Sequence, residues 1–317
     1  MASAVRTFDY MPAVREATPL LLGLVGPSGT GKTFSALRLA TGIQRVSGGE
    51  IALIDTEARR ALHYAEKFRF NHVPFGAPFS PLDYLAAINH CIAKGAKVII
   101  IDSMSHEHEG PGGVLEMHDQ ELQRMSGGDR GKAERMNLLA WQKPKAERRR
   151  LINSILQMDI NCIFAFRSKE KLKIVKGQDP EPLGFMPIAG EEFVYEMILK
   201  CLLLPGANGV PTLSSGFRGE QMMVKVPEQF HQLFAKPVQL SEDIGEALAR
   251  WAAGTPSATG TLAELFLQYE ACSDAATYRT LEASRRVLWD AATKESRAAL
   301  KAAADAAQAR IGATAAA

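Results

Sequence analysis

The sequence lacks a metal-binding cysteine pair, a long apolar run and a strong excess of charge. Its four cysteines lie far apart with no C-x-x-C motif, which argues against a cysteine-based zinc site and for a reduced, intracellular protein. No apolar stretch approaches the length of a membrane span, and the first residues lack the apolar core of a secretory signal. We therefore expect a cytoplasmic protein. The formal net charge of +2 identifies no partner.

A phosphate-binding motif lies near the N-terminus, between an apolar segment and a helical pattern. Residues 26–33 fit G-x-x-x-x-G-K-[ST] at every fixed position. Glycines let the backbone curl around phosphates with its N–H groups inward, and the following helix adds its positive end. Lys32 would reach the β- and γ-phosphates, and the Thr33 hydroxyl would bind Mg²⁺. The expected nucleotide contacts are Gly26, Pro27, Ser28, Gly29, Thr30, Gly31, Lys32, Thr33 and Phe34.

Strands and helices are predicted to alternate, which indicates an α/β fold with a mainly parallel central sheet. Continuous apolar runs such as 98–101 are typical of a sheet covered on both faces. The predicted strands are 20–25, 51–55, 97–101, 160–166, 194–204 and 221–226. The predicted helices are 32–46, 58–69, 81–94 and 133–158.

Composition divides the chain into four parts. We expect an N-terminal arm over 1–18, a nucleotide-binding core over 19–240, and a short helix with a linker over 241–260. The last part, 261–317, is Ala-rich and predicted to be a small helical module. Its charges balance, so they give no electrostatic reason to bind DNA.

Two predicted strands end in carboxylates. Val98-Ile99-Ile100-Ile101-Asp102 has the form of a Walker B element, whose acid would hold Mg²⁺ beside the phosphate loop. A helix-capping role is the alternative for Asp102. The strand over 51–55 ends in Asp55 and is followed by Glu57.

Two segments resemble a known family. The run ALIDTEARRALHYAEKF is similar to the segment of RecA-type recombinases in which a strand delivers the glutamate that activates the attacking water. The run VIIIDSMSHEHEGPGGVLE resembles the minimal RecA-like P-loop ATPases of bacteriophages. The resemblance implies that Glu57 is the general base and that Tyr64, seven residues later, stacks on adenine. Ala61 stands where the family has an acid that reads the adenine edge.

Each of these residues has a simpler alternative. The alternative for Glu57 is a solvated carboxylate at the start of a helix, where the helix dipole favours a negative charge. The alternative for Tyr64 is a packing residue. Glu107 is a second candidate for the base. The run His106-Glu107-His108-Glu109 lacks the H-E-x-x-H spacing, so we expect a polar loop beside the phosphates rather than a metal site.

Two basic segments, 124–150 and 167–176, follow the Walker B strand and the next strand, where RecA-like proteins have their DNA-binding loops. The resemblance implies that these segments are mobile and neutralise the phosphates of single-stranded DNA, while Phe185 and Met186 stack on or wedge between bases. A solvated helix face is the alternative for the first segment, and we prefer it for Arg148-Arg149-Arg150. The predicted DNA contacts are Arg130, Lys132, Arg167, Lys169, Lys171, Lys173 and Phe185, and Lys176 belongs to the same segment.

RecA-like ATPases hydrolyse ATP at subunit interfaces with a cation supplied in trans. The resemblance therefore implies a filament or ring, with Arg218 or Lys225 as the trans-acting cation and Arg167 as another option. The arm residues Phe8 to Met11 would dock on the neighbouring subunit. The C-terminal helices would contact a single-strand DNA-binding protein.

The sequence as a whole predicts an ATP- and Mg²⁺-dependent, single-strand DNA-binding ATPase of phage-type recombination or strand annealing, acting in a bacterial host cell. One alternative is a RecA-like ring helicase or helicase loader. The other is an NTPase that acts on a protein or small-molecule partner without DNA. Stimulation of turnover by DNA would separate the first two hypotheses from the third.

Overall fold

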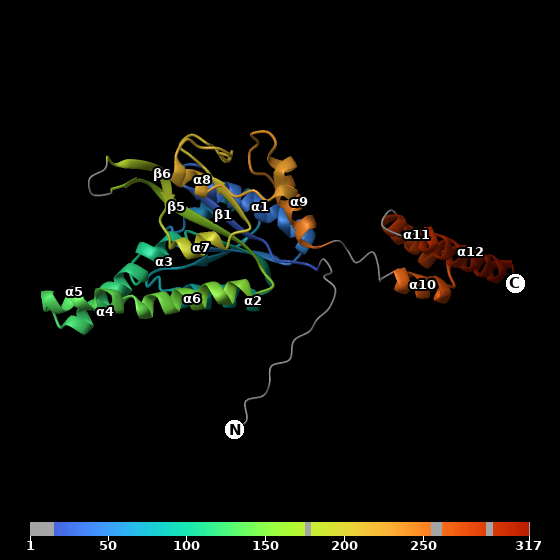
Figure 1. Cartoon of the computed structure of the whole chain (residues 1–317), viewed down its shortest axis with the longest axis horizontal. Coiled ribbons are helices and arrows are strands. Elements are labelled where there is room, and N and C mark those ends of the chain that lie inside the picture. Colours follow the sequence, from blue (N-terminus) through green and yellow to red (C-terminus); the bar gives the residue numbers. More distant parts are fainter. Residues whose placement is uncertain (1–15, 175–178, 255–261, 290–293, 317) are drawn as a thin grey trace, which may run out of the picture. The chain divides into compact units, whose positions relative to one another are not determined.

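The computed structural model describes residues 16–174, 179–254, 262–289 and 294–316. The described chain forms two compact units, of which the larger is Thr18–Ala253 and the smaller contains the C-terminal helices (Figure 1). The arm residues Phe8 to Met11, Lys176 and the linker after Gly254 lie outside the described residues.

The larger unit is built on a seven-stranded sheet. Neighbouring strands follow the order β3-β2-β4-β5-β1-β7 and are all parallel, while β6 pairs antiparallel with β5. This arrangement confirms the expected α/β fold with a mainly parallel sheet. The strands are β1 (Leu21–Gly26), β2 (Glu50–Asp55), β3 (Asn71–Pro74), β4 (Ala96–Asp102), β5 (Asn161–Lys173), β6 (Glu181–Pro187) and β7 (Leu199–Leu202).

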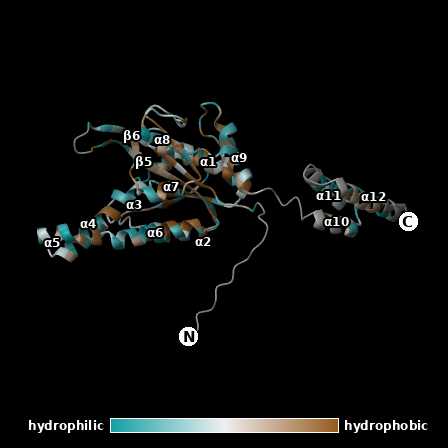
Figure 2. Ribbon diagram, in the orientation of Figure 1, coloured by the Kyte–Doolittle hydropathy of each residue, from teal (hydrophilic) through white to brown (hydrophobic). Residues whose placement is uncertain are grey.

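Helices cover both faces of the sheet and leave its strands buried (Figure 2). One face packs against α2 and α6, and the other against α1 and α9. The longer helices of this unit are α1 (Lys32–Ser47), α2 (Pro81–Ala93), α4 (Val114–Ser126), α5 (Arg130–Ala140), α6 (Gln142–Leu156) and α9 (Glu242–Ala252). The short ones are η1 (Arg60–Tyr64), α3 (Ser105–Glu109), α7 (Glu191–Tyr195), α8 (Arg218–Met222) and η2 (Glu228–Phe234).

The parallel register brings the ends of β1, β2 and β4 to one edge of the sheet, beside Arg167 in the middle of β5. Gly26 on β1 pairs with Arg167 on β5, and Asp55 on β2 pairs with Asp102 on β4. Ligands of open α/β sheets bind at the carboxyl ends of the strands. The phosphate loop and both strand-end acids therefore lie at this edge.

Several predicted elements are wrong in their bounds or type. The predicted helix 58–69 is only the single-turn η1, and the predicted helix 133–158 is two helices, α5 and α6. Of the predicted strand 194–204, only β7 is a strand, and the first two residues of the predicted strand belong to α7. The predicted strand 221–226 is α8 followed by a single bridge at Lys225, because buried Glu220 fixes α8 through hydrogen bonds from Phe185 N and Ser215 Oγ.

The short helix expected at the start of 241–260 is α9, which Ser241 caps by accepting from Ile244 N at 3.3 Å and which belongs to the larger unit. Gly42 of α1 approaches α9 so closely that a Cβ there would lie 1.8 Å from the Glu242 carbonyl oxygen. The smaller unit is formed by α10 (Leu262–Ala271), α11 (Ala275–Trp289) and α12 (Lys294–Ala316). Leu265, Tyr269 and Leu300 are among the side chains of its own core.

Candidate active site

The phosphate loop connects β1 to α1 and is held closed by its own hydrogen bonds. Gly29 and Gly31 have φ values of +82° and +92°, in the left-handed region that glycine adopts without strain. The Thr30 hydroxyl donates to the Pro27 carbonyl at 3.0 Å. Lys32 Nζ donates to the Gly26 and Pro27 carbonyls at 2.7 Å each, and burial lowers the pKa of Lys32.

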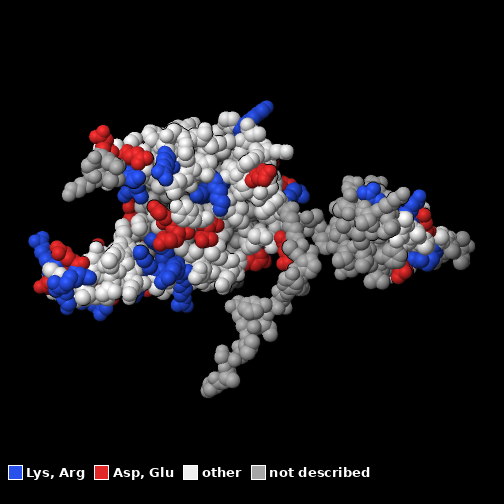
Figure 3. Space-filling view, viewed as in Figure 1, with Lys and Arg blue, Asp and Glu red and all other residues white. Residues whose placement is uncertain are grey.

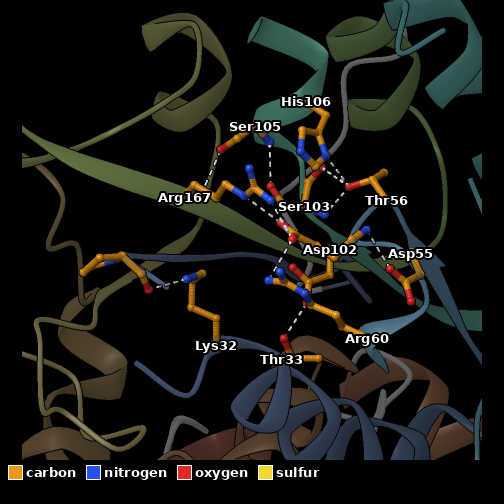
Figure 4. A network of polar contacts seen from close by, with 12 residues as sticks. Lys32, Thr33, Asp55, Thr56, Arg60, Asp102, Ser103, Ser105, His106 and Arg167 are labelled. Carbon is orange, nitrogen blue, oxygen red and sulfur yellow. Dashed lines mark hydrogen bonds and ion pairs between the residues drawn. The ribbon is translucent and has the colours of Figure 1, made fainter. Parts of the chain in front are cut away.

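Thr33 and Asp102 meet at the floor of the site (Figure 4). The Thr33 hydroxyl donates to Asp102 Oδ2 at 2.5 Å. Burial raises the pKa of Asp102, and the hydrogen bond from Thr33 partly offsets this effect. A hydroxyl beside a buried carboxylate is an all-oxygen donor set of the kind Mg²⁺ takes together with phosphate oxygens. These two residues therefore fit the expected Mg²⁺ site.

Asp55 and Glu57 have different surroundings. Asp55 is buried and accepts hydrogen bonds from the backbone N–H of Glu57 at 2.7 Å and of Ala61 at 3.2 Å. His72 Nε2 lies 3.0 Å from the same carboxylate. Asp55 thus fixes the turn that leads into η1, and this turn directs Glu57 into the site. Ala61 is buried under the turn, and its side chain offers no polar group to the adenine edge of a nucleotide.

Arg167 holds Glu57 in a bidentate ion pair. Arg167 Nε and Nη2 each lie 2.6 Å from a Glu57 carboxylate oxygen. Burial raises the pKa of Glu57, but the hydrogen bonds and charge of Arg167 outweigh it, so the net pKa lies below its usual value. Arg167, expected both among the DNA contacts and as an optional catalytic cation, thus lies at the nucleotide site.

These groups surround one cavity of about 430 Å³, a size suited to a nucleotide. The Ser168 hydroxyl is buried in its wall and has no hydrogen-bond partner within the described residues, so a polar ligand would satisfy it. Phe34 does not line the cavity but packs against Tyr64 and Phe68. The lining residues are Ser28, Gly29, Gly31, Lys32, Thr33, Glu57, Arg60, Tyr64, Asp102, Glu109, Arg167, Ser168 and Ile188.

The His-Glu-His-Glu run forms the short helix α3, and its side chains diverge. His106 Nδ1 lies 2.6 Å from Thr56 Oγ1, while the Ser105 hydroxyl accepts from the Arg167 backbone at 2.9 Å. Burial lowers the pKa of His108 to about 4. No metal-binding cluster of three or more His, Cys, Asp or Glu side chains occurs within the described residues. The run is therefore a short helix and not the expected polar loop.

Glu107 is unsuited to be the second candidate for the base. It is buried, and its carboxylate binds Arg148 on α6 through contacts of 3.0 and 2.9 Å. Burial raises the pKa of Glu107, although Arg148 opposes that shift. The preferred interpretation of Arg148 as part of a solvated helix face is therefore wrong, whereas Arg149 and Arg150 are exposed as expected.

The first basic segment is helical rather than a loop. Arg130 and Lys132 are exposed in the first turn of α5, which Asp129 caps by accepting from the Lys132 backbone at 2.6 Å. Figure 3 shows blue basic side chains gathered at the end of the unit where α5 lies. Red acidic side chains also gather on the larger unit in this view. Among the exposed acids of this unit are Glu191 and Glu192 in α7 and Glu196 directly after it.

The second basic segment is a two-stranded ribbon made of β5 and β6, not a loop. Lys169, Lys171 and Lys173 are exposed on β5. Lys169 and Lys173 lie 3.5 Å from Glu109 and Glu181, respectively. On β6, Phe185 is half-buried, but Met186 belongs to the core, so the expected role of Met186 in base stacking is wrong.

The two candidate trans-acting cations lie away from the cavity of their own chain. Arg218 is exposed in α8, and Lys225 Nζ donates to the Met197 carbonyl at 2.8 Å. Their action on a neighbouring subunit stays a prediction. Glu109 comes from the run that was expected beside the phosphates. Residues that the sequence did not single out for the site are Arg60, Ser168 and Ile188, of which only Arg60, three residues after Glu57, carried a local signal.

Comparison with known proteins assigns the larger unit to a family. A family model described as an AAA domain matches residues 18–199, more than half of the chain. A search of curated proteins found no match. Within the described residues, no helix has the length and apolar character needed to cross a bilayer.

Proposed function

Because this chain belongs to the AAA-domain family, with a P-loop nucleotide-binding core, we propose that it hydrolyses ATP in a manner coupled to single-stranded DNA. The observation that carries the proposal is the course of β5. This strand places Arg167 beside Glu57 in the nucleotide cavity and then continues into the exposed lysines of the ribbon. The same strand thus belongs to both proposed sites.

Hydrolysis would use the residues around the cavity. Backbone N–H groups of the phosphate loop and Lys32 would bind the phosphate oxygens and orient the γ-phosphate. The Glu57 carboxylate would accept a proton from water, whose oxygen bonds to the γ-phosphorus as the bond to the β–γ bridging oxygen breaks, leaving ADP and phosphate. Thr33 and Asp102 would hold Mg²⁺, which supplies charge neutralisation at the phosphates. Tyr64 would contact the base.

DNA binding would depend mainly on the ribbon. Lys169, Lys171 and Lys173 can neutralise backbone phosphates with little cost in desolvation, because all three are exposed. Phe185, opposite Glu170 in the ribbon, offers a partly exposed ring for stacking. Arg130 and Lys132 on α5 are a second basic surface. We also propose a role in phage-type recombination or strand annealing, with self-assembly on DNA and the C-terminal helices as a contact for a single-strand DNA-binding protein, because segments 52–68 and 98–116 resemble RecA-like ATPases of bacteriophages.

The test is steady-state ATP hydrolysis with Mg²⁺, with and without a single-stranded oligonucleotide, at one fixed moderate salt concentration. We expect turnover without DNA and clear stimulation by DNA. Turnover that is indifferent to DNA would overturn the coupling and favour an NTPase that acts on a protein or small molecule. Unwinding of a duplex and a stable hexamer without DNA would favour the ring helicase instead.

DNA affinity at several salt concentrations tests the ribbon separately. Replacing Lys169, Lys171 and Lys173 by Gln removes three charges and should reduce the slope of log K against log salt by about 2. The matched comparison is the pair Arg130→Gln and Lys132→Gln on α5. If only the α5 pair lowers the slope, the ribbon is not the principal DNA contact.

A further inference from the structure

Two ion pairs, Lys169–Glu109 and Arg167–Glu57, lie between the ribbon and the proposed catalytic base, and Glu109 and Arg167 line the same cavity. Lys169 Nζ lies 3.5 Å from Glu109 Oε2 at the base of the ribbon. Glu109 lines the same cavity as Arg167 and Glu57, and Arg167 binds Glu57 at 2.6 Å. Four side chains of alternating charge, Lys169, Glu109, Arg167 and Glu57, therefore lead from the exposed ribbon into the cavity.

Arg167 has a second carboxylate in its surroundings. The pKa of Arg167 lies above its usual value, first because of the hydrogen bonds to Glu57 and to a smaller extent because of the charge of Glu109. The Arg167 side chain is 39% exposed, so it has space to turn. Its backbone is held, because its N–H donates to Ser105 Oγ at 2.9 Å and its carbonyl accepts from Ile188 N at 2.8 Å. Only the guanidinium is therefore free to change partner.

We propose that a polyanion on the ribbon frees Glu57 by an exchange of ion-pair partners. A phosphate that binds Lys169 leaves Glu109 without its cation. Glu109 then competes with Glu57 for the Arg167 guanidinium, and the released Glu57 carboxylate accepts the proton of the attacking water. This exchange rests on the proposed function, since it describes how DNA regulates the same site.

Because the charges alternate, the exchange predicts the direction in which each substitution changes ATP turnover. Loss of the Lys169 charge imitates an occupied ribbon, whereas loss of the Glu109 charge removes the alternative partner of Arg167. The Lys169–Glu109 pair is largely exposed, with side-chain exposures of 58% and 33%. Exposed pairs of this kind alter an equilibrium by up to about fivefold, which bounds the expected effect.

Two single variants and their combination test the proposal through ATP turnover without DNA. Lys169→Gln should raise the DNA-free rate by about two- to fivefold. Glu109→Gln in the same chain should return that rate to the value of the unmodified protein, because Glu109 is the group through which Lys169 acts. An unchanged rate in Lys169→Gln, or a raised rate that persists in the double variant, overturns the proposal.

Stimulation by DNA provides the second measurement. Glu109→Gln should reduce the ratio of rates with and without DNA to about 1, while DNA binds at least as tightly, since a negative charge is removed. The matched control is Glu181→Gln, which removes a carboxylate 3.5 Å from Lys173 but outside the cavity, and it should keep the full ratio. Loss of stimulation in both variants overturns the exchange. Absence of turnover or of a DNA effect in the unmodified protein instead overturns the proposed function.

Discussion

Replacement of Arg148 by Met should strongly destabilise the larger unit. The side chains of Arg148 and Glu107 are only 7% and 5% exposed, and their closest contact is 2.9 Å. At that distance the attraction is about 6 kcal/mol for an effective dielectric constant of about 20. Removal of one partner of a buried pair leaves the other charge buried and costs about 3–5 kcal/mol. We expect this loss in the free energy of unfolding.

Urea denaturation followed by tryptophan fluorescence measures the loss, because Trp141 and Trp251 belong to the larger unit. With a slope of about 1–3 kcal/mol per molar urea, the midpoint should fall by at least about 1 M. The matched control is Arg149→Met on the same helix. Arg149 is exposed, so the change should cost less than about 0.5 kcal/mol.

The destabilisation of Arg148→Met should also depend on pH. Burial raises the pKa of Glu107 above 4.5, and loss of Arg148 removes the charge that opposes this shift. A carboxyl whose pKa is higher in the folded state destabilises that state as the pH rises through the folded pKa. The loss in the free energy of unfolding that Arg148→Met causes should therefore become smaller as the pH falls toward 4.5. A loss below about 1 kcal/mol at pH 7, or one that acid does not reduce, would refute the reasoning.

Substitutions at three further residues test the candidate active site. Lys32→Ala should lower ATP turnover by about 100-fold or more, since it removes the cation at the phosphates, and turnover like that of the unmodified protein would contradict the assignment. Asp55→Ala should cost about 1–3 kcal/mol in urea denaturation, because it leaves the buried N–H of Ala61 without an acceptor. Tyr64→Ala should raise the KM for ATP about tenfold through lost stacking on the base, whereas Tyr64→Phe should not, and equal KM values in both variants would leave Tyr64 as a packing residue.

The phosphate loop and the position of Asp102 beside it were predictable because their signals are local. Gly29 and Gly31 occupy positions where only glycine adopts the backbone without strain, and Lys32 follows at a fixed spacing. The apolar run that ends at Asp102 needs burial on both faces, which a parallel sheet provides. Once the sheet is parallel, the carboxyl ends of its strands meet at one edge, so Asp102 falls beside Thr33.

Contacts between distant segments were not predictable from the same patterns. Glu107 and Arg148 are separated by 41 positions, and neither has a neighbour in the sequence that indicates burial. Glu57 and Arg167 are 110 positions apart, so a basic residue in a lysine-rich segment gave no sign that it binds a carboxylate. The proline and glycine of β6 are typical of loops, yet pairing with β5 outweighs that preference. Contacts between distant segments also explain why α8 replaces the start of the predicted strand 221–226, because Phe185 N and Ser215 Oγ donate hydrogen bonds to buried Glu220.

The single turn α3 allows little change in length. Consecutive side chains of this helix reach different parts of the unit: Ser105 contacts β5, His106 contacts Thr56 after β2, and Glu107 contacts α6. One inserted or deleted residue would rotate every later side chain by about 100° around the helix axis. Each of these side chains would then face a different part of the unit and lose its present contact. Related chains should therefore vary in the residues of this turn far more readily than in the number of residues between Met104 and Gly110.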